Sequence, residues 1–353
     1  MTATTGDFTL SGVAIPVDTG SMLDEICEHF VEHAEVRREA EAVHLQSVYG
    51  HADIRAVGGR LLIDLACPSR PTLEAVRNVI AEHLFLFAGD DPLDLSWSDG
   101  APAARLPDLH EVTVVSTAEI TPRMRRVTVA CADVTAFIGG ALHVRLLIPP
   151  KDREPVWPTP RADGRIGWPK GEDELTVRVY TIRAVDPARK KLHIDFVQHA
   201  ADGHPAPGAD FGRLARPGDR LALIGPGGGG VPEAEHLFLA GDETALPAIA
   251  RIAAEAPATT RIRALIEVEN AAERQDLPSA ASLDVRWLHR QDTQPEARSL
   301  LADAVLGELP ALDAAGHVWI GCERDDARRI REALKTRGHD RHRMSVAAYW
   351  VRE

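Results

Sequence analysis

Leu175-Thr-Val-Arg-Val-Tyr-Thr-Ile-Arg183 is the stretch from which both a fold and a binding site are first inferred. β-Branched residues alternate with larger ones along it, which predicts a β-strand. Since side chains of a strand alternate between its faces, Arg178 and Tyr180 share one face and Thr181 lies on the other. A guanidinium and a phenol ring side by side suit a ligand with phosphates and an aromatic ring. The alternative is an exposed strand face without a ligand.

The sequence around this stretch predicts an all-β domain. Short apolar stretches recur between Gly, Pro and Asp residues, which favours a small antiparallel β-barrel of six strands. We expect its strands at 111–116, 125–130, 143–148, 175–182, 192–198 and 220–224. The Pro-, Gly- and Arg-rich segment from Pro149 to Gly171 is expected to form a long loop on this barrel.

Beyond Gly225 the pattern changes to alternating strands and helices. The run from Gly225 to Gly230 lacks the Lys-Ser/Thr ending of a P-loop and the spacing of a dinucleotide fingerprint, so it is interpreted as a flexible junction. Alternation of this kind predicts a Rossmann-like α/β domain with a mostly parallel sheet. Its strands are expected at 236–240, 262–268, 283–289 and 317–321, with helices after 244, at 296–306 and at 325–336.

The N-terminal part predicts a small α+β domain. A helix capped by Asp18 or Ser21 and a second helix from Ser69 to Gly89 flank strands expected at 8–15, 42–49, 52–57 and 60–67. His29 and His33 have metal-ligand spacing on the first helix, but no third ligand is positioned by the pattern. A solvated polar face is therefore preferred over a metal site.

These changes in pattern divide the chain into four segments. Residues 1–97 form the α+β domain, 98–108 a linker rich in Ala, Pro, Asp and Gly, 109–226 the barrel, and 227–353 the α/β domain. Two or three domains are the usual division for a chain of 353 residues.

Composition excludes several classes of function. A formal net charge of −13 argues against general nucleic-acid binding. No apolar run is long enough for a membrane span and the first ten residues lack the pattern of a signal peptide, so a cytoplasmic location without membrane insertion is expected. The four cysteines contain no Cys-x-x-Cys pair, which supports neither a zinc site nor an iron–sulfur cluster. Redox chemistry would therefore need an organic cofactor.

Four motifs together resemble the siderophore-interacting proteins, flavin-dependent ferric-siderophore reductases of the ferredoxin–NADP reductase superfamily. They are Arg178-Val-Tyr-Thr-Ile-Arg183, Asp195-Phe-Val-Gln-His199, Arg216-Pro-Gly-Asp219 with Gly225-Pro-Gly, and Leu239-Ala-Gly-Asp-Glu-Thr-Ala-Leu-Pro247. Trp319-Ile-Gly-Cys-Glu323 and Tyr349-Trp350 also fit. The resemblance covers the chain from about Leu109 onward, and residues 1–97 resemble a small domain of unassigned function that some family members carry.

The resemblance implies roles for individual residues. Arg178 would hold the FAD pyrophosphate, Tyr180 would pack against the isoalloxazine, and Thr181 would hydrogen-bond near its reactive edge. Further cofactor contacts are implied for Asp195, Val197, His199, Gly241, Asp242, Glu243, Thr244 and Trp350. For Asp242 and Glu243, which precede a helix, ribose contacts and N-terminal capping remain open alternatives.

The resemblance also implies an activity. NADPH or NADH would reduce FAD, and the flavin would pass electrons to the iron of a ferric siderophore or another ferric chelate, releasing Fe(II) for iron assimilation. Arg125, Arg126 and Arg343 are the candidates for binding an anionic chelate, because an acidic protein needs a local basic pocket for it.

The chain departs from the family pattern at Ala200–Gly212, where Phe211 stands at the position of a Trp and prolines reduce the number of free backbone amides. Two alternative functions therefore stay open. The chain could be a flavin- or iron-chelate-binding module without turnover, or a flavin reductase that releases reduced flavin.

Overall fold

The computed structural model describes residues 8–31, 34–100, 105–198, 206–292 and 299–352. The chain forms two compact units, and each is described by itself. The first comprises residues 1–109 together with 152–175, and the second comprises residues 110–151 together with 176–353.

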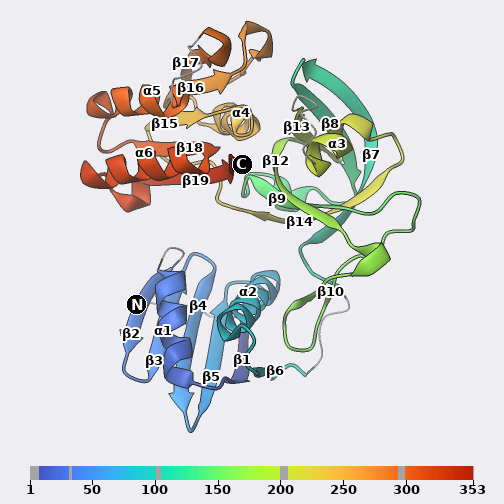
Figure 1. The fold of residues 1–353 in the computed structure, drawn as a ribbon, viewed down its shortest axis with the longest axis vertical. Coiled ribbons are helices and arrows are strands. Elements are labelled where there is room, and N and C mark those ends of the chain that lie inside the picture. Colours follow the sequence, from blue (N-terminus) through green and yellow to red (C-terminus); the bar gives the residue numbers. More distant parts are fainter. Residues whose placement is uncertain (1–7, 32–33, 101–104, 199–205, 293–298, 353) are drawn as a thin grey trace. The chain divides into compact units, whose positions relative to one another are not determined.

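The first unit is an antiparallel sheet with two helices on one face (Figure 1). Its strand order is β2-β3-β4-β5-β1-β6. The bounds are β1 Phe8–Ile15, α1 Thr19–Phe30, β2 Glu35–Glu39, β3 Ala42–Ser47, β4 Gly50–Val57, β5 Arg60–Cys67, α2 Arg70–Ala88 and β6 Asp94–Trp97. Asp18 and Ser69 cap the two helices, as their side-chain oxygens accept from the backbone N–H groups of Ser21 and Thr72.

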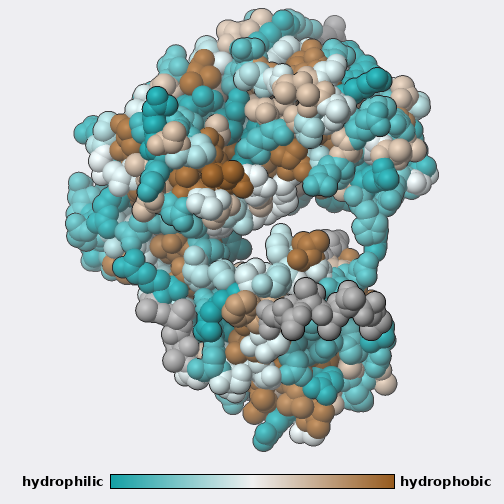
Figure 2. Space-filling view, turned by 180° about the vertical axis from the view of Figure 1, so that it is seen from behind, coloured by the Kyte–Doolittle hydropathy of each residue, from teal (hydrophilic) through white to brown (hydrophobic). Residues whose placement is uncertain are grey.

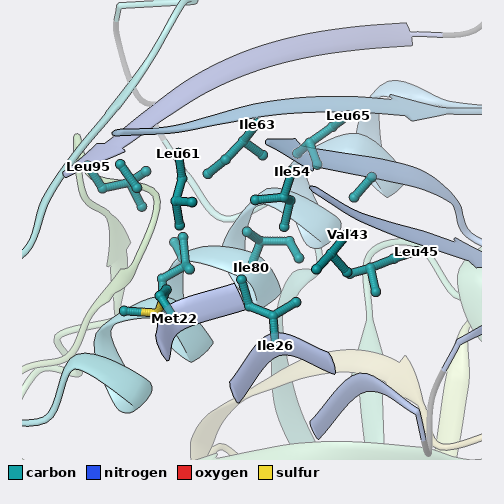
Figure 3. Packing of buried hydrophobic residues seen from close by; sticks show 14 of the residues in the cluster. Met22, Ile26, Val43, Leu45, Ile54, Leu61, Ile63, Leu65, Ile80 and Leu95 are labelled. Atoms are coloured by element: carbon teal, nitrogen blue, oxygen red, sulfur yellow. The ribbon is translucent and has the colours of Figure 1, made fainter. Parts of the chain in front are cut away.

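The core of this unit lies between the helices and one face of the sheet (Figure 3). Every second residue along the strands points toward the helices. Ile54 and Ile63 of the sheet thus lie in one buried cluster with Ile26 and Ile80 of the helices. This is the packing expected of an amphipathic helix on a half-buried sheet. The α+β prediction is confirmed, while the two edge strands β2 and β6 were not predicted.

The segment from Asp152 to Leu175 departs from expectation, because it packs on the first unit rather than on the barrel whose strands it connects. It contains the two-stranded hairpin of β10 (Thr159–Pro160) and β11 (Ile166–Gly167). The indole N–H of Trp97 donates to the carbonyl of Asp163 at 2.9 Å. The N–H of Ile166 donates to Oε1 of Glu82 at 2.8 Å.

The second unit begins with the predicted barrel, which is closed, antiparallel and six-stranded in the order β12-β13-β8-β7-β14-β9. Its strands are β7 Leu109–Thr121, β8 Met124–Cys131, β9 His143–Ile148, β12 Thr176–Asp186, β13 Lys191–Val197 and β14 Arg220–Gly227. Strand β14 extends into the glycine run expected to be a flexible junction, and the N–H of Leu142 donates to Gly229 at 2.8 Å. That run is therefore tied to the barrel.

A five-stranded parallel sheet in the order β17-β16-β15-β18-β19 completes this unit. The bounds are β15 His236–Gly241, α4 Leu246–Glu255, β16 Arg261–Val268, β17 Ser282–His289, α5 Leu300–Glu308, β18 His317–Glu323, α6 Arg324–Thr336 and β19 Met344–Trp350. Helix α4 packs on one face, and α5 and α6 pack on the other. The Rossmann-like prediction is confirmed. Strand β19 and the helix α3 (Pro207–Leu214) were not predicted.

Hydrophilic residues make up most of the surface seen in Figure 2, and hydrophobic residues lie on it in small separate groups. Within the described ranges, no helix combines the length and the apolar character that crossing a bilayer requires.

Candidate cofactor site

Strand β12 presents the predicted binding residues with their hydrogen-bonding groups largely free. Arg178 is exposed, and its guanidinium donates to the carbonyl of Val177 at 2.8 Å, the one hydrogen bond it makes within the described part of the chain. Thr181 is buried, yet its hydroxyl has no hydrogen-bond partner among the described residues. Such unsatisfied polar groups on one strand are suited to binding a polar ligand.

The ring of Tyr180 packs on Phe196, with ring centroids 4.3 Å apart. Helix α3 closes over this pair. A Cβ atom at position 208 would collide with the Tyr180 hydroxyl, so the helix needs glycine there. Burial raises the pKa of Tyr180 to about 12, and the phenol therefore stays protonated at neutral pH. Phe211 of α3 lies 5.7 Å from Phe196, so the divergent segment contributes an aromatic ring to the same cluster.

Asp195 does not lie open to a nucleotide. Both of its carboxylate oxygens accept from Arg126, at 2.6 and 2.8 Å, and its side chain is buried. Arg183 lies near this pair, its buried Nε atom has no partner among the described residues, and burial lowers its pKa. Arg126 and Asp195, which were expected to contact different ligands, thus bind each other.

Val197 and His199 follow on the same strand. Val197 is half-buried against the apolar cluster that joins Met124 to the α/β part of the unit. It therefore contributes to the packing of barrel and sheet. His199 lies outside the described residues.

The turn from Gly241 to Thr244 follows strand β15 at the carboxyl edge of the parallel sheet, where dinucleotides bind in α/β domains. Gly241 is needed here, because a Cβ atom would lie 2.5 Å from that of Ala245 and 2.7 Å from the carbonyl of Gly321. Asp242 accepts from the N–H and the hydroxyl of Thr244, at 2.9 and 2.5 Å, and from the indole N–H of Trp350 at 2.7 Å. Burial raises the pKa of Asp242.

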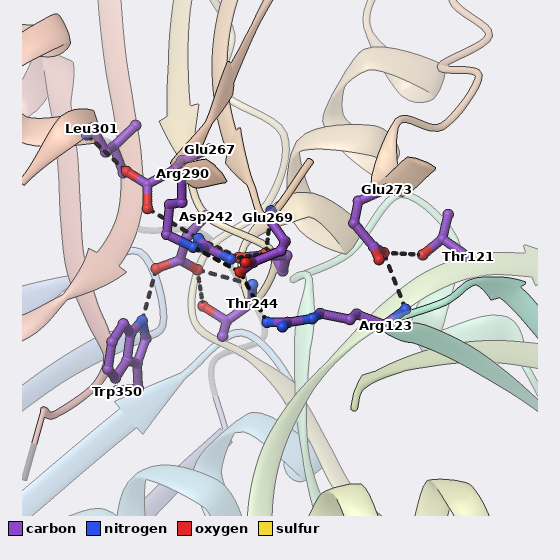
Figure 4. A network of polar contacts seen from close by, with 11 residues as sticks. Thr121, Arg123, Asp242, Thr244, Glu267, Glu269, Glu273, Arg290, Leu301 and Trp350 are labelled. Atoms are coloured by element: carbon purple, nitrogen blue, oxygen red, sulfur yellow. Dashed lines mark hydrogen bonds and ion pairs between the residues drawn. The ribbon is translucent and has the colours of Figure 1, made fainter. Parts of the chain in front are cut away.

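A network of ion pairs lies beside this turn (Figure 4). Arg290, which directly follows β17, donates to Glu243 and, at 3.0 Å, to Glu267. Burial lowers the pKa of Arg290, but these two ion pairs outweigh burial and raise it above its usual value. Glu243 also accepts from the N–H of Glu269 at 3.0 Å. All four oxygens of Asp242 and Glu243 are thus engaged inside the protein, and helix α4 has no side-chain cap.

The arginines expected to bind substrate are not gathered in one place. Arg125 donates to the hydroxyl of Thr117 at 3.0 Å on the neighbouring barrel strand. Arg126 binds Asp195, as described above. Arg343 donates to the carbonyl of Ala315 beside the parallel sheet. Among these three, none shares a bonding partner with another.

Two pairs that sequence reasoning missed join the barrel to the parallel sheet. Arg251 of α4 is 1% exposed and donates to the barrel carbonyls of Ile182 and Phe137, at 3.1 and 2.7 Å. The Nε2 atom of His143 on β9 lies 2.6 Å from the hydroxyl of Tyr349 on β19. The sequence hinted at the contacts of Arg251 only by placing a single arginine among the apolar residues of α4. Nothing in the sequence indicated the contact between His143 and Tyr349.

No group of three potential metal ligands occurs in the part of the chain that the structure describes. His29 lies with its ring 4.4 Å from that of His83, and His33 is outside the described residues. Cys322 is buried, and burial raises the pKa of its thiol well above the usual value. A thiol in that state is a structural rather than a reactive group.

The second unit combines a closed antiparallel barrel with a parallel sheet, the architecture expected above for ferredoxin–NADP reductase-type flavoproteins, and within the described residues Arg178 and Thr181 of one barrel strand keep hydrogen-bonding groups without a partner. Family models agree. Residues 113–230 match a siderophore-interacting FAD-binding domain, and residues 234–353 match the siderophore-interacting protein model. Residues 14–98 match a domain described as an uncharacterized protein conserved in bacteria.

Comparison with individual proteins identifies the family. A siderophore utilization protein from T. fusca is 35% identical, with a TM-score of 0.57 over 71% of this chain and 97% of that one. The siderophore-interacting protein SipS from Aeromonas hydrophila is 26% identical, with a TM-score of 0.55 over 71% of this chain and all of that one (100%). Ferric vibriobactin reductase ViuB of Vibrio cholerae is 27% identical over 240 residues, which are 66% of this chain and 86% of that protein.

The chain belongs to the siderophore-interacting protein family. This confirms the predicted family, fold class and FAD-binding domain. The residues present fit the cofactor, since within the described ranges Arg178 has N–H groups free for phosphate oxygens and the Thr181 hydroxyl has no hydrogen-bond partner.

Proposed function

We propose that this protein is an NAD(P)H-dependent ferric-siderophore reductase. The observation that carries the proposal is strand β12, in one compact unit with a parallel sheet. On it Arg178 is exposed, Tyr180 is half-buried, and the Thr181 hydroxyl has no hydrogen-bond partner among the residues that the structure describes. The relatives named as ferric vibriobactin and ferric acinetobactin reductases support the same substrate class. The cytoplasm, where NAD(P)H is supplied, is the location we propose.

In this proposal the three domains of the chain have separate roles. Residues 109–226 bind FAD and residues 227–353 bind the nicotinamide dinucleotide, while residues 1–97 form a further domain. FAD, when bound, would supply the redox chemistry, namely hydride acceptance and single-electron transfer. Arg178 binds the pyrophosphate, Tyr180 packs against the flavin ring, and Thr181 donates or accepts at its polar edge.

The remaining site residues position these groups. Asp195 orients Arg126, and Val197 packs the barrel against the sheet. Gly241 to Thr244 form the turn that is proposed to bind the dinucleotide. Trp350 lies beside this turn, because its indole N–H donates to Asp242. His199, Arg125 and Arg343 remain candidates for contacts with cofactor or chelate.

The deciding experiment is anaerobic reduction of a ferric chelate by the purified, FAD-loaded protein, with NADPH and NADH assayed in turn. A yellow protein whose flavin bleaches on addition of either nicotinamide, and which then forms Fe(II), supports the proposal. A colourless protein that takes up no added FAD would instead support an iron-chelate-binding module without turnover.

A flavin reductase that releases reduced flavin is the second candidate. Rates with ferric chelate and with free flavin as acceptors separate the two activities. A faster rate with free flavin, with release of reduced flavin from the protein, would replace the ferric reductase.

A further inference from the structure

Strand β19 is held through its backbone on one edge only. It lies at the edge of the parallel sheet and pairs with β18 on one side, and its other edge makes no sheet hydrogen bonds within the described residues. It ends with Tyr349 and Trp350, and Trp350 is one of the proposed cofactor-binding residues. The position of Trp350 therefore depends on how the end of β19 is held.

Each of the two aromatic residues is held by one side-chain hydrogen bond. The Tyr349 hydroxyl lies 2.6 Å from Nε2 of His143 on the barrel, and the Trp350 indole N–H lies 2.7 Å from Oδ2 of Asp242 at the edge of the sheet. The end of β19 thus bridges the two parts of the second unit. Figure 4 shows the contact of Trp350 with Asp242.

The direction of the bond between Tyr349 and His143 depends on which ring nitrogen of His143 carries the hydrogen. The Nδ1 atom of His143 faces Gly228, and a backbone hydrogen bond at Gly228 raises the pKa of the ring, so we assign the ring hydrogen to Nδ1. The other ring nitrogen, Nε2, is then an acceptor. Burial raises the pKa of Tyr349 above its usual value, so its hydroxyl keeps its proton and donates.

The ring of Tyr349 fits tightly at this position. A Cβ atom at residue 321 would lie 2.9 Å from the ring, so only glycine leaves room for it on β18. Its centroid lies 6.1 Å from Trp319 and 5.5 Å from His143, with nearly perpendicular planes in both cases. The ring is therefore held by packing, and the hydroxyl is directed at His143.

The location of His143 ties this bond to the proposed flavin strand. His143 is the direct cross-strand partner of Thr181, and partners in an antiparallel pair project from the same face. A displacement of β19 would therefore alter the surroundings of Thr181, the residue proposed to hydrogen-bond near the reactive edge of the flavin.

We propose that His143 is a positioning residue which, through Tyr349, fixes the end of strand β19 and with it the side chain of Trp350 beside the cofactor. This inference rests on the proposed function for the role of Trp350. The hydrogen bond itself, and its effect on Trp350, can be measured without cofactor.

The test uses Tyr349→Phe, which removes the hydroxyl and keeps the ring against Gly321 and Trp319. His143→Phe removes the acceptor, and His143→Gln restores one. Ser345→Ala is the matched control, because it removes a side-chain hydrogen bond of the same strand, to His317 at 3.0 Å, far from Trp350. Circular dichroism confirms that each variant is folded.

The first measurement is fluorine NMR of the cofactor-free full chain labelled with 5-fluorotryptophan, with the Trp350 signal assigned from Trp350→Phe. We expect this signal to shift and broaden in Tyr349→Phe and His143→Phe, to recover in His143→Gln, and to stay unchanged in Ser345→Ala. An unchanged Trp350 signal in both Tyr349→Phe and His143→Phe would overturn the proposal.

The second measurement is the rate of flavin reduction by NAD(P)H in the FAD-loaded protein. Loss of one hydrogen bond predicts a decrease of about 3- to 10-fold in Tyr349→Phe, with FAD affinity unchanged. A rate equal to that of Ser345→Ala would refute a catalytic consequence. Complete lack of FAD binding in the wild type would remove the proposed function, while the NMR measurement would still decide whether His143 positions Trp350.

Discussion

Arg178 has no carboxylate partner among the described residues, unlike many other arginines of this protein. Arg126, Arg290 and Arg123 each bind a carboxylate, whereas Arg178 donates to its neighbour's carbonyl. Hydrogen bonds to a charged group contribute about 1.5–3 kcal/mol, so Arg178→Ala is predicted to raise the Kd for FAD about 10- to 150-fold. Titration of the cofactor-free protein with FAD, followed by flavin fluorescence, measures this.

The matched control is Arg145→Ala, because Arg145 is also an exposed arginine of the barrel and is the cross-strand partner of Val179. It is expected to leave the Kd within about twofold, the size of a surface substitution. Equal losses in both variants would mean that net charge, rather than a specific contact of Arg178, governs FAD binding.

His143 makes the stability of the protein depend on pH. Burial lowers its pKa, the Gly228 backbone raises it and Arg251 from α4 lowers it, so the neutral ring is favoured in the folded state. Tyr349 from β19 also faces it, as a neutral donor. The neutral ring's contribution is complete above the unfolded pKa near 6.5 and is lost as the pH falls through the lower folded value.

We therefore predict that between pH 7.5 and pH 5 the wild type loses more free energy of unfolding than His143→Gln does. Urea unfolding curves at the two pH values measure the difference. Parallel losses would show that other groups cause the acid sensitivity.

At the residue scale the sequence predicted neither burial nor partners in full. Period-2 spacing placed Arg178 and Tyr180 on one face of β12 and Thr181 on the other, but burial does not alternate along this strand, since Arg178 and Val179 are both exposed and Thr181 and Ile182 are both buried. The same reasoning could not pair Asp195 with Arg126, because their contact joins neighbouring strands that are 69 positions apart in sequence. Cross-strand register is set by the fold, and one strand's sequence does not contain it.

Helix α4 is one of the elements that link the sheet to the barrel, and Arg251 provides hydrogen bonds from it to the barrel. Arg251→Met would leave the carbonyls of Ile182 and Phe137 without a donor and Glu255 without its partner at 2.8 Å. Breaking a buried charged contact costs about 3–5 kcal/mol, so we predict a loss of this size in the free energy of unfolding. Chemical denaturation measures it.

Arg213→Ala on helix α3 serves as the control for Arg251→Met. Arg213 is exposed and pairs with Asp210 within one turn of its own helix, a contact of about 0.3–0.5 kcal/mol. If Arg251→Met were no more destabilising than Arg213→Ala, the hydrogen bonds from α4 to the barrel would not hold the two parts together.

At the element scale, strongly patterned segments were predicted and weakly patterned ones were not. Strands β1, β5 and β9 begin and end where the sequence indicated, because apolar residues alternate along them between turn residues. Strand β2 consists of Glu-Val-Arg-Arg-Glu at a sheet edge and is mostly exposed, so it has no apolar face to reveal it. Strand β19 is also an edge strand with mostly small or exposed side chains.

For the molecule as a whole, the sequence could not show where residues 152–175 pack. They connect strands β9 and β12 of the barrel, yet they belong to the first compact unit. The guanidinium of Arg165 lies 3.4 Å above the ring of Phe85, and the Trp97 and Glu82 hydrogen bonds flank this contact. These pairs are separated by 66 to 84 positions, beyond the reach of any periodicity.

Glu82 therefore gives a test of whether the N-terminal domain orders this hairpin. Glu82→Ala removes the acceptor of the Ile166 N–H, and we predict that amide exchange at 164–167 becomes about 5- to 10-fold faster, as expected for loss of a hydrogen bond of about 1 kcal/mol or slightly more. Hydrogen exchange of the full chain, followed by mass spectrometry, measures this. Glu74→Ala is the control on the same helix, since Glu74 pairs with Arg70 and not with the hairpin. Equal exchange at 164–167 in both variants and the wild type would contradict this prediction. It would mean that the hairpin keeps its conformation without the hydrogen bond from Glu82, and that contact with the domain does not order it.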